Sequence, residues 1–358
     1  MSGLGVYFSA LEDPRASNVR HRLGDVCVMM IAASLCGATS ATEMALFAAQ
    51  RRPALSRLIA YEQAPSHDTF SRMLRLIAPD RFSALLARLA GALGAQVATA
   101  GGPDVVAIDG KALRHAYEKG CAAHPALTVS AFAARTRLCL GAAAPGPQAN
   151  EIEAALAVVD LLDLAGRIVT ADALHCHHRM ADAVTRRGGD YLLALKGNRR
   201  QWLAMARGAF ADGREPDLVQ EEIGHDRHER RCVFVRPTDK PLAAGHAAFV
   251  RIDASRDGGP ARTRLFLASR CFTPEEALAI TRAHWSIENA LHWMLDVHLC
   301  EDARRVRRDN APENTAILGR IARNILQACD TPKTPIAHRI RKCAWNDDYL
   351  IKAIAHMR

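Results

Sequence analysis

Apolar residues at helical spacing run through the first part of the chain. In "PSHDTFSRMLRLI" (65–77), Phe70, Leu74 and Ile77 recur every three or four residues and form one stripe of a helix. Ser66 or Asp68 is suited to cap that helix. The small and turn-forming residues of "ATAGGPD" then indicate a linker. We therefore predict an all-α N-terminal domain over residues 1–97, which is rich in arginine and suited to binding DNA.

After this linker the pattern changes to short apolar runs. "DVVAIDG" (104–110), "ALTVSAFAAR" and "LCLGAAA" are typical of buried strands, and "NEIEAALAVVDLLDL" (150–164) is typical of a helix. A strand over "RIVTADA" (167–173), a helix and a strand over "DYLLALKG" (190–197) follow. The order is βββ-α-β-α-β, which a ribonuclease H-like fold would give. We expect an α/β catalytic core of this kind over residues 98–330.

The order of the core is interrupted over about residues 205–270. Strand-like runs separated by Gly and Pro fill this segment and predict a β-rich insertion. A long helix is then predicted over 273–297, because Thr273 is a natural N-cap and Pro274 suits the first helical position. Helical, basic sequence continues to the last residue. We assign residues 331–358 to a basic helical C-terminal tail.

Three acids fall where this fold would bring them together. In a ribonuclease H-like sheet the first strand lies beside the fourth. Asp109 is expected at the end of the first strand and Asp172 near the end of the fourth. Trp285, Glu288 and His292 are spaced i, i+3 and i+7, so they share one face of the long predicted helix. That face could pack on the sheet and bring Glu288 to the two aspartates.

Converging carboxylates are costly unless a cation neutralises them, because like charges raise each other's pKa. Mg²⁺ or Mn²⁺ is the cation suited to carboxylate and phosphate oxygens. Two such ions can support an in-line displacement at phosphorus. Each acid by itself is more often a turn or surface residue. The combination is what favours a catalytic triad of Asp109, Asp172 and Glu288 that binds metal.

A zinc site competes with this interpretation of Asp172. The string "ADALHCHHRM" places His175, Cys176, His177 and His178 directly after that acid. Structural zinc takes four ligands from separated positions, commonly as two pairs, and no second pair is evident in the sequence. We therefore predict that Asp172 is the functional residue. The histidines are expected to form a basic, partly exposed start of a helix near DNA.

The composition of the chain favours a nucleic-acid partner and a cytosolic location. The 358 residues include 47 Lys and Arg against 38 Asp and Glu, a formal net charge of +9. This balance favours a polyanion such as nucleic acid, although an enzyme that is merely basic stays open. Ten cysteines without a CxxC pair are typical of reduced thiols in a cytosolic protein. The apolar run over residues 26–38 is too short to span a bilayer, so no membrane partner is expected.

Several long strings resemble one family. The chain is similar to the DDE transposases of the ISAs type, also called H-repeat-associated proteins, in "PSHDTFSRML", "AIDGKALR", "IVTADAL", "GGDYLLALKGN", "RAHWSIENALHWMLDV", "EDARRVRRDNAPEN" and "AWNDDYLIK". The resemblance extends over nearly the whole chain, and the "HWxIEN" string with "NAPEN" downstream is long and specific. The chain departs from the family at a few positions, among them Ala112, where the family usually has Thr.

The resemblance implies a function and a site. Position by position, the family's triad falls on Asp109, Asp172 and Glu288, with Mg²⁺ (or Mn²⁺) as cofactor. It implies a bacterial DNA transposase that cuts double-stranded DNA at transposon ends and joins the 3′-hydroxyls to target DNA. A homodimer on DNA is expected because two ends must be brought together, and a cytoplasmic, nucleoid-associated location follows. Two alternatives stay open: a domesticated DNA-binding protein, and a metal-dependent nuclease without strand transfer.

Further residues beside the triad are predicted to contact DNA. They follow Asp109, end the fifth strand or flank Glu288, and they are Lys111, Arg114, Lys196, Asn198, Arg282, His284, Trp285, Asn289 and His292. Trp285 and Trp293 could stack on an unpaired base, with buried packing as the alternative. The string "RRVRRDN" (304–310) is either a DNA-facing stripe or a solvated helix face.

Overall fold

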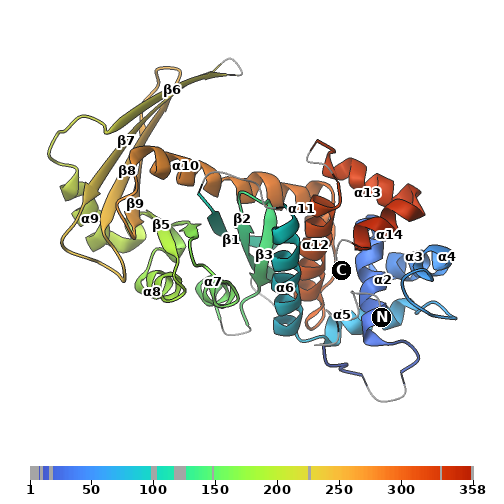
Figure 1. Ribbon diagram of the computed structural model, residues 1–358. Coiled ribbons are helices and arrows are strands. Elements are labelled where there is room, and N and C mark those ends of the chain that lie inside the picture. Colours follow the sequence, from blue (N-terminus) through green and yellow to red (C-terminus); the bar gives the residue numbers. More distant parts are fainter. Residues whose placement is uncertain are drawn as a thin grey trace.

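The molecule is elongated, with a sheet in the middle, helices at one end and long strands at the other (Figure 1). This computed structural model describes residues 8, 11–15, 19–97, 103–116, 126–146, 149–224, 227–330 and 333–355. The first and last helices lie together at the helical end. Among the helices in these ranges, none has the length and apolar character that crossing a membrane requires.

The N-terminal region is helical, as predicted. Its helices are α2 (Leu23–Leu35), α3 (Ala41–Gln50), α4 (Arg52–Leu55), α5 (His67–Leu76) and α6 (Pro79–Val97). Ser66 is the N-cap of α5, since its side chain accepts a hydrogen bond from the Thr69 N–H, which settles the choice between the two expected caps. Helix α2 is apolar on nearly all sides and almost entirely buried, because the other helices of this end surround it.

The central sheet has the topology expected of a ribonuclease H-like fold. Its first five strands are β1 (Val105–Leu113), β2 (Ala126–Ala133), β3 (Leu138–Ala143), β4 (Ile168–Ala171) and β5 (Asp190–Leu195). In space their order is β3-β2-β1-β4-β5. Strands β2 and β3 run antiparallel, whereas β1, β4 and β5 are parallel to one another. The predicted strand order is therefore confirmed.

Alternate residues of the parallel strands face two different layers. Val106, Val169 and Leu193 join the core formed with α7 (Glu151–Asp160) and α8 (His178–Arg186). Their neighbours Val105, Ile168 and Leu192 instead join the apolar cluster that includes α10 (Pro274–His284). A strand buried on both faces needs apolar residues at consecutive positions, which accounts for the continuous apolar runs of β1 and β4. The helix α10 thus crosses the face opposite α7 and α8.

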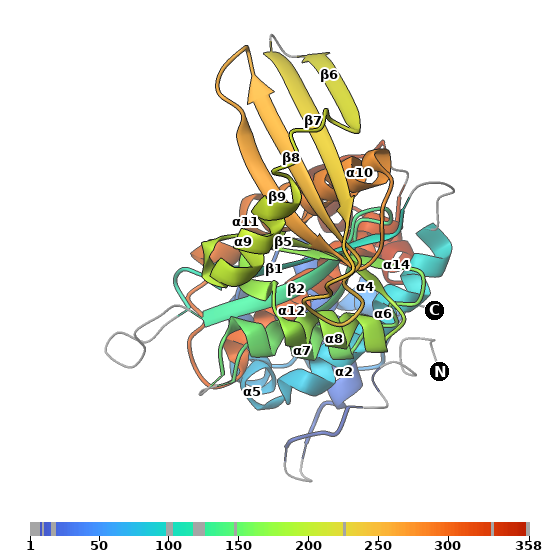
Figure 2. The same cartoon turned by 90° about the vertical axis from the view of Figure 1, so that its left-hand side faces the viewer.

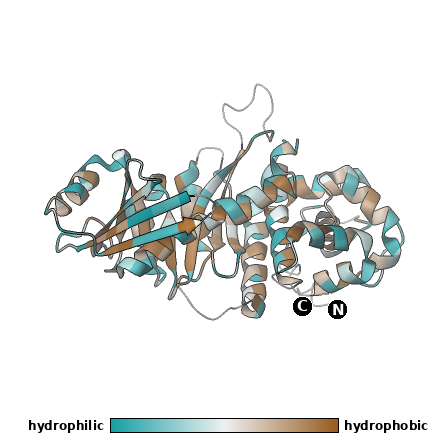
Figure 3. Ribbon diagram, turned by 90° about the horizontal axis from the view of Figure 1, so that it is seen from above, coloured by the Kyte–Doolittle hydropathy of each residue, from teal (hydrophilic) through white to brown (hydrophobic). Residues whose placement is uncertain are grey.

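The segment expected to be a β-rich insertion extends this same sheet. It consists of α9 (Arg200–Ala209), β6 (Leu218–Gly224), β7 (Arg227–Pro237), β8 (Ala248–Arg256) and β9 (Arg262–Ala268). Strand β9 pairs antiparallel with β5, and the nine-stranded order ends β5-β9-β8-β7-β6. Figure 2 shows these strands projecting beyond the helices. They are apolar where they join the sheet and polar toward their tips (Figure 3).

The long helix expected over 273–297 is not one continuous α-helix. Thr273 caps α10 in a capping box with Glu276, as its sequence suggested. A π-helical turn (Ile287–His292) follows, and α11 (Trp293–Val297) completes the run. The Trp293 N–H donates to the Glu288 carbonyl five residues back, which is the hydrogen bond that defines a π-turn.

The C-terminal helices return to the helical end of the molecule. They are α12 (Ala311–Ala328), α13 (Ile336–Trp345) and α14 (Asp347–Ala355). One apolar cluster continues from α2 and α6 through β3 and α12, and α13 and α14 pack against α2 and α12. The domain boundaries after residues 97 and 330 therefore stay predictions, since this core crosses both of them.

The basic string over 304–310 is not the solvated helix face that was one of its two interpretations, whereas the DNA-facing stripe stays a prediction. These residues form a loop, not a helix. Arg304 is buried and donates hydrogen bonds to the carbonyls of Leu299 and Thr315. Backbone carbonyls outside this string accept hydrogen bonds from the Arg304 guanidinium, and the spacing of residues along the chain could not predict such partners.

Candidate active site

Strand register brings the two aspartates side by side. The parallel pairing of β1 with β4 ends at Ile108 opposite Ala171, and the next residues are Asp109 and Asp172. Asp109 was expected at the end of its strand, but β1 continues along β2 to Leu113. The acid therefore lies in the middle of β1, where the parallel pairing stops and β4 turns away. Such a divergence opens space at the carboxyl ends of parallel strands.

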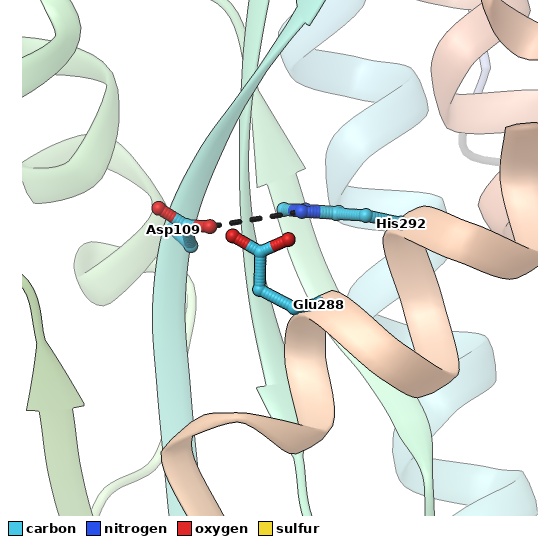
Figure 4. A group of neighbouring side chains, drawn as sticks. All are labelled: Asp109, Glu288 and His292. Carbon is cyan, nitrogen blue, oxygen red and sulfur yellow. Dashed lines mark ion pairs between the residues drawn. The ribbon is translucent and has the colours of Figure 1, made fainter. Parts of the chain in front are cut away.

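Glu288 reaches the aspartates from the π-turn. One cleft is lined by Asp109, Asp172 and Glu288 together, with Lys196 and Trp285 also on its wall. Figure 4 shows the carboxylates of Asp109 and Glu288 facing each other. The structure thus brings the three predicted acids to one place from three separate elements. Their catalytic role stays a prediction.

The electrostatics of Asp109 reflect this crowding. Burial and then the Glu288 carboxylate raise the pKa of Asp109 to about 7, with smaller contributions from Asp172 and Glu151. The Gly110 N–H opposes the shift by hydrogen bonding to the carboxylate. Near-neutral pH therefore leaves this group partly protonated until a cation relieves the repulsion. Carboxylate oxygens crowded in this way suit a hard divalent cation.

Glu151 is a nearby acid that the sequence analysis missed. It lies in the first turn of α7, and a β-carbon on Gly110 would clash with its carboxylate. Glycine directly after Asp109 therefore permits a close approach between β1 and α7. The signal available in the sequence was an acid at the start of the helix predicted over 150–164, next to Asn150, which the structure shows to be the N-cap. That signal also fits a purely structural role at a helix N-terminus.

His292 points at the acids, although it was expected to contact DNA. Its side chain is 9% exposed, and its Nδ1 lies 3.6 Å from Oδ2 of Asp109 (Figure 4). Single ligand atoms of Asp109, Glu288 and His292 all lie within 4.8 Å of one another. Burial, followed by the charges of Arg320 and Lys111, lowers the pKa of His292 to about 3, so the ring is neutral. This position does not fit a phosphate contact.

The histidines after Asp172 differ from the basic helix start that was expected. His175 is fully buried, with Nε2 at 3.4 Å from Oε1 of Glu151. His177 is buried and caps α8 by accepting a hydrogen bond from the Met180 N–H, and burial lowers its pKa to about 4. Burial also raises the pKa of Cys176 to about 12. The expectation of exposed, charged histidines is therefore wrong for His175 and His177, because both pack into the core.

Lys111 also lies in a place that its sequence context did not suggest. It is 8% exposed, and its ammonium lies 2.8 Å from Asp296 and 3.0 Å from Asp302. A buried ammonium held by two carboxylates does not fit the phosphate contact expected of it. Arg114 remains exposed but shares Asp302, at 3.2 Å. These pairs fasten the end of β1 to α11, through Asp296, and to the segment that follows α11, through Asp302.

Two more of the predicted DNA contacts, Asn198 and His284, form hydrogen bonds to residues close to Asp172 in the sequence. Asn198 donates a hydrogen bond of 2.6 Å to the Ala173 carbonyl, and so holds the turn that follows Asp172. His284 lies with Nδ1 at 3.0 Å from Oγ1 of Thr170, and burial lowers its pKa. Lys196, in contrast, is exposed on the cleft wall, where a phosphate could reach it.

The remaining predicted contacts are exposed side chains of α10, the π-turn and the residues next to them. Trp285 and Trp293 are 47% and 54% exposed, so the alternative of buried packing is wrong for both. The Arg264 guanidinium lies 5.3 Å from the centre of the Trp285 ring. Arg282 forms an ion pair with Glu222 of β6, and Asn289 is exposed.

A basic groove continues from the cleft along β8, β9 and α10. Arg264 and Trp285 line both the cleft and the groove. The groove walls carry five arginines against one glutamate, namely Arg231, Arg256, Arg262, Arg264, Arg282 and Glu229. Arg262 and Arg264 form no ion pair with any residue that the structure describes. Sequence analysis missed them; the alternation in "RTR" at the start of β9 was the available signal.

A ribonuclease H-like sheet with three acids at one cleft is the arrangement of the enzymes that cut or join nucleic-acid strands. The family model described as "Transposase DDE domain" matches residues 100–325, and the model described as "DDE_Tnp_1-associated" matches residues 6–90. The chain belongs to this DDE transposase family, whose chemistry implies a dependence on divalent metal ions.

Relatives of known sequence support the assignment over the full length. The chain is 30% identical over 369 residues to "Putative protein YbfL" of Escherichia coli K12, covering 98% of this chain and 97% of that protein. It is 29% identical to "H repeat-associated putative transposase YhhI" of the same organism, with the same coverage. A solved piggyBac transposase synaptic complex with hairpin DNA aligns with a TM-score of 0.42 and 11% identity, over 98% of this chain and 77% of that one.

Proposed function

We propose that this protein cuts DNA at the ends of an insertion sequence and joins the 3′-hydroxyls to target DNA, with Mg²⁺ or Mn²⁺ as cofactor. The observation that carries the proposal is the convergence of Asp109, Asp172 and Glu288 on one cleft, from which a basic groove extends. An acidic cleft suits metal ions, and a basic groove suits the phosphates of a DNA strand entering it. The two surfaces adjoin, as a phosphodiester reaction requires.

The residues of the cleft fit divalent cations. Asp109, Asp172 and Glu288 would hold them through carboxylate oxygens, and a cation would offset both the burial and the Glu288 charge that raise the pKa of Asp109. Such ions, when bound, activate an attacking oxygen and stabilise the leaving one. Asp172 is oriented for its part, because its Oδ1 accepts a hydrogen bond from the Leu174 N–H. Glu288 is exposed and so accessible to a ligand.

DNA is positioned by the groove in this proposal. Arg262 and Arg264 are the arginines whose charge is available for phosphates, and Lys196, which follows the last paired residue of β5 beside β9, holds a phosphate at the cleft. Trp285 offers an exposed ring between the two surfaces, where a base could stack. These contacts position the strand at the acids without reading sequence. A homodimer on double-stranded DNA stays a prediction.

The test is cleavage of DNA that contains the element's ends, with divalent metal and with chelator. Glu288→Gln, Asp109→Asn and Asp172→Asn each remove one charge from the site and should slow cleavage by on the order of 10²-fold or more. Binding of the ends should persist, because it rests on contacts between cations and phosphates. Glu275→Gln, on the exposed first turn of α10, is the matched control and should cut normally. Near-normal cleavage by a triad variant would remove that residue from the proposed triad.

The two alternatives predict different results with the wild-type protein. Pre-cleaved ends supplied with target DNA should be joined by a transposase. A nuclease would cut the flanking DNA but leave such ends unjoined, and a domesticated DNA-binding protein would bind the ends and do neither. Strand transfer in the presence of metal is therefore the result that supports the proposal over both alternatives.

A further inference from the structure

We infer that His292 is a nitrogen ligand to a divalent metal held by Asp109 and Glu288, so that this transposase site is a mixed nitrogen and oxygen site. The inference rests on the proposed metal-dependent function and deepens it. It adds a ligand that was expected to contact DNA.

The positions of the three side chains support metal binding by His292. Ligand atoms of Asp109, Glu288 and His292 lie within 4.8 Å of one another, which is close enough for one ion to touch all three after small side-chain rotations. Nδ1 of His292 lies 3.6 Å from Oδ2 of Asp109, beyond the length of a good hydrogen bond. Figure 4 shows the ring and the two carboxylates directed at a common point.

The burial and hydrogen bonding of the His292 imidazole also support a metal ligand. The ring is buried, and its Nε2 has no hydrogen-bond partner among the described residues. A buried polar nitrogen without a partner costs free energy, and such groups in native proteins commonly serve a ligand or a function. Nδ1, the ring nitrogen nearest Asp109, faces the carboxylates of Asp109 and Glu288 and can present its lone pair to a cation bound there. An ordinary core residue at this position would be apolar.

The backbone that carries Glu288 and His292 is of a kind found at functional sites. Glu288 and His292 both lie on the π-turn, and the hydrogen bond from the Trp293 N–H to the Glu288 carbonyl widens the helix there. Such insertions are less stable than α-helix and occur frequently at functional sites. Lys111, the cation nearest along β1, is already paired with Asp296 and Asp302. Lys111 therefore does not neutralise the carboxylates of Asp109 and Glu288, which remain available to a metal ion.

A nitrogen ligand has a consequence for metal choice. Mg²⁺ prefers oxygen ligands, whereas the first-row transition ions accept imidazole nitrogen, Mn²⁺ the most weakly of the series. The site should therefore favour Mn²⁺ over Mg²⁺ more strongly than three carboxylates alone would. Replacing His292 should reduce that preference, because Mg²⁺ gains little from the ring.

The decisive measurement is pulsed electron paramagnetic resonance of Mn²⁺ bound to the purified full-length protein, which detects ¹⁴N nuclei coordinated to the ion. We expect a ¹⁴N coupling of a directly bound imidazole in the wild type and its loss in His292→Phe, which keeps the ring shape. His284→Phe is the matched control: His284 lines the same cleft next to Asp172, and its replacement should leave the signal unchanged. His292→Asn serves as a second variant if the phenylalanine is not accommodated, with circular dichroism as the check on folding.

A second readout is the ratio of Mn²⁺ to Mg²⁺ affinity from calorimetric titration. Loss of a ligand should weaken Mn²⁺ binding by about tenfold or more in His292→Phe, with a smaller effect on Mg²⁺. A wild-type Mn²⁺ spectrum without ¹⁴N coupling overturns the inference, as does a signal lost with His284 and kept without His292. If the protein cuts DNA but shows no ¹⁴N coupling, the His292 inference is wrong and the proposed function stands. If the coupling is present but the protein never cuts DNA, the metal site stands and the proposed function is wrong.

Discussion

Removing the charge of Asp109 should stabilise the metal-free protein. Its carboxyl lies beside Glu288 and is 21% exposed, and its pKa is raised from 3.8 to about 7. An acid whose pKa is higher in the folded state binds more protons there than in the unfolded chain, so the free energy of unfolding falls as the pH rises from about 4 to 7. Asp109→Asn abolishes that fall while keeping a hydrogen-bond acceptor for the Gly110 N–H.

The size of the effect follows from the two pKa values. The interval from 3.8 to about 7 corresponds, at about 1.36 kcal/mol per pH unit, to about 4 kcal/mol above pH 7. At pH 5.5 only about 2 kcal/mol of the difference should have developed. The residual exposure of the carboxyl makes both figures upper bounds. Asp109→Asn should therefore be more stable than wild type in chelator, and more so at pH 8 than at pH 5.5.

Urea unfolding monitored by circular dichroism, in chelator at both pH values, measures this directly. Asp182→Asn, an exposed acid of α8 paired with Arg186, is the matched control and should change stability by no more than about 0.5 kcal/mol. Added Mn²⁺ should stabilise the wild type and not Asp109→Asn, because binding to the folded state is linked to stability. If Asp109→Asn is no more stable than wild type at pH 8, burial and the Glu288 charge do not penalise the ionised Asp109 carboxylate.

Three further predictions concern other parts of the molecule. Glu301→Gln leaves the fully buried Arg320, 2.8 Å away, without its counter-charge and should cost about 3–5 kcal/mol in urea unfolding; a loss below about 1 kcal/mol would show that the pair is not buried. Thr273→Ala removes the cap of α10 and should cost about 1 kcal/mol in thermal unfolding, whereas Thr273→Ser should not. Arg264→Ala should weaken binding of end DNA and reduce the salt dependence by about one phosphate contact, and an unchanged salt slope would exclude this side chain from the interface.

Much of the fold was determined by local sequence pattern. The apolar runs of β1 and β4 indicated strands buried on both faces, and with the intervening helices they predicted the βββ-α-β-α-β order that the structure confirms. The cap at Thr273 was predictable, and that of α5 could be narrowed to Ser66 or Asp68, because a cap involves only residues three positions apart. Asp109 and Asp172 could be placed together for a related reason: each directly follows a residue of the parallel pairing between β1 and β4.

The partners of individual side chains were decided only by tertiary structure. Lys111 appeared free to contact DNA, but it meets Asp296 and Asp302 from a segment more than 180 residues away. His292 shares the predicted helix face with Glu288, but only the packing of that face against β1 shows that the ring lies 3.6 Å from Asp109. The π-turn that carries both residues was also not predicted. Apolar periodicity cannot separate a π-turn from an α-helix, since the two differ by one residue in the hydrogen-bond spacing. Pattern along the chain reports which face of an element is buried, whereas the identity of the group opposite depends on how distant elements pack.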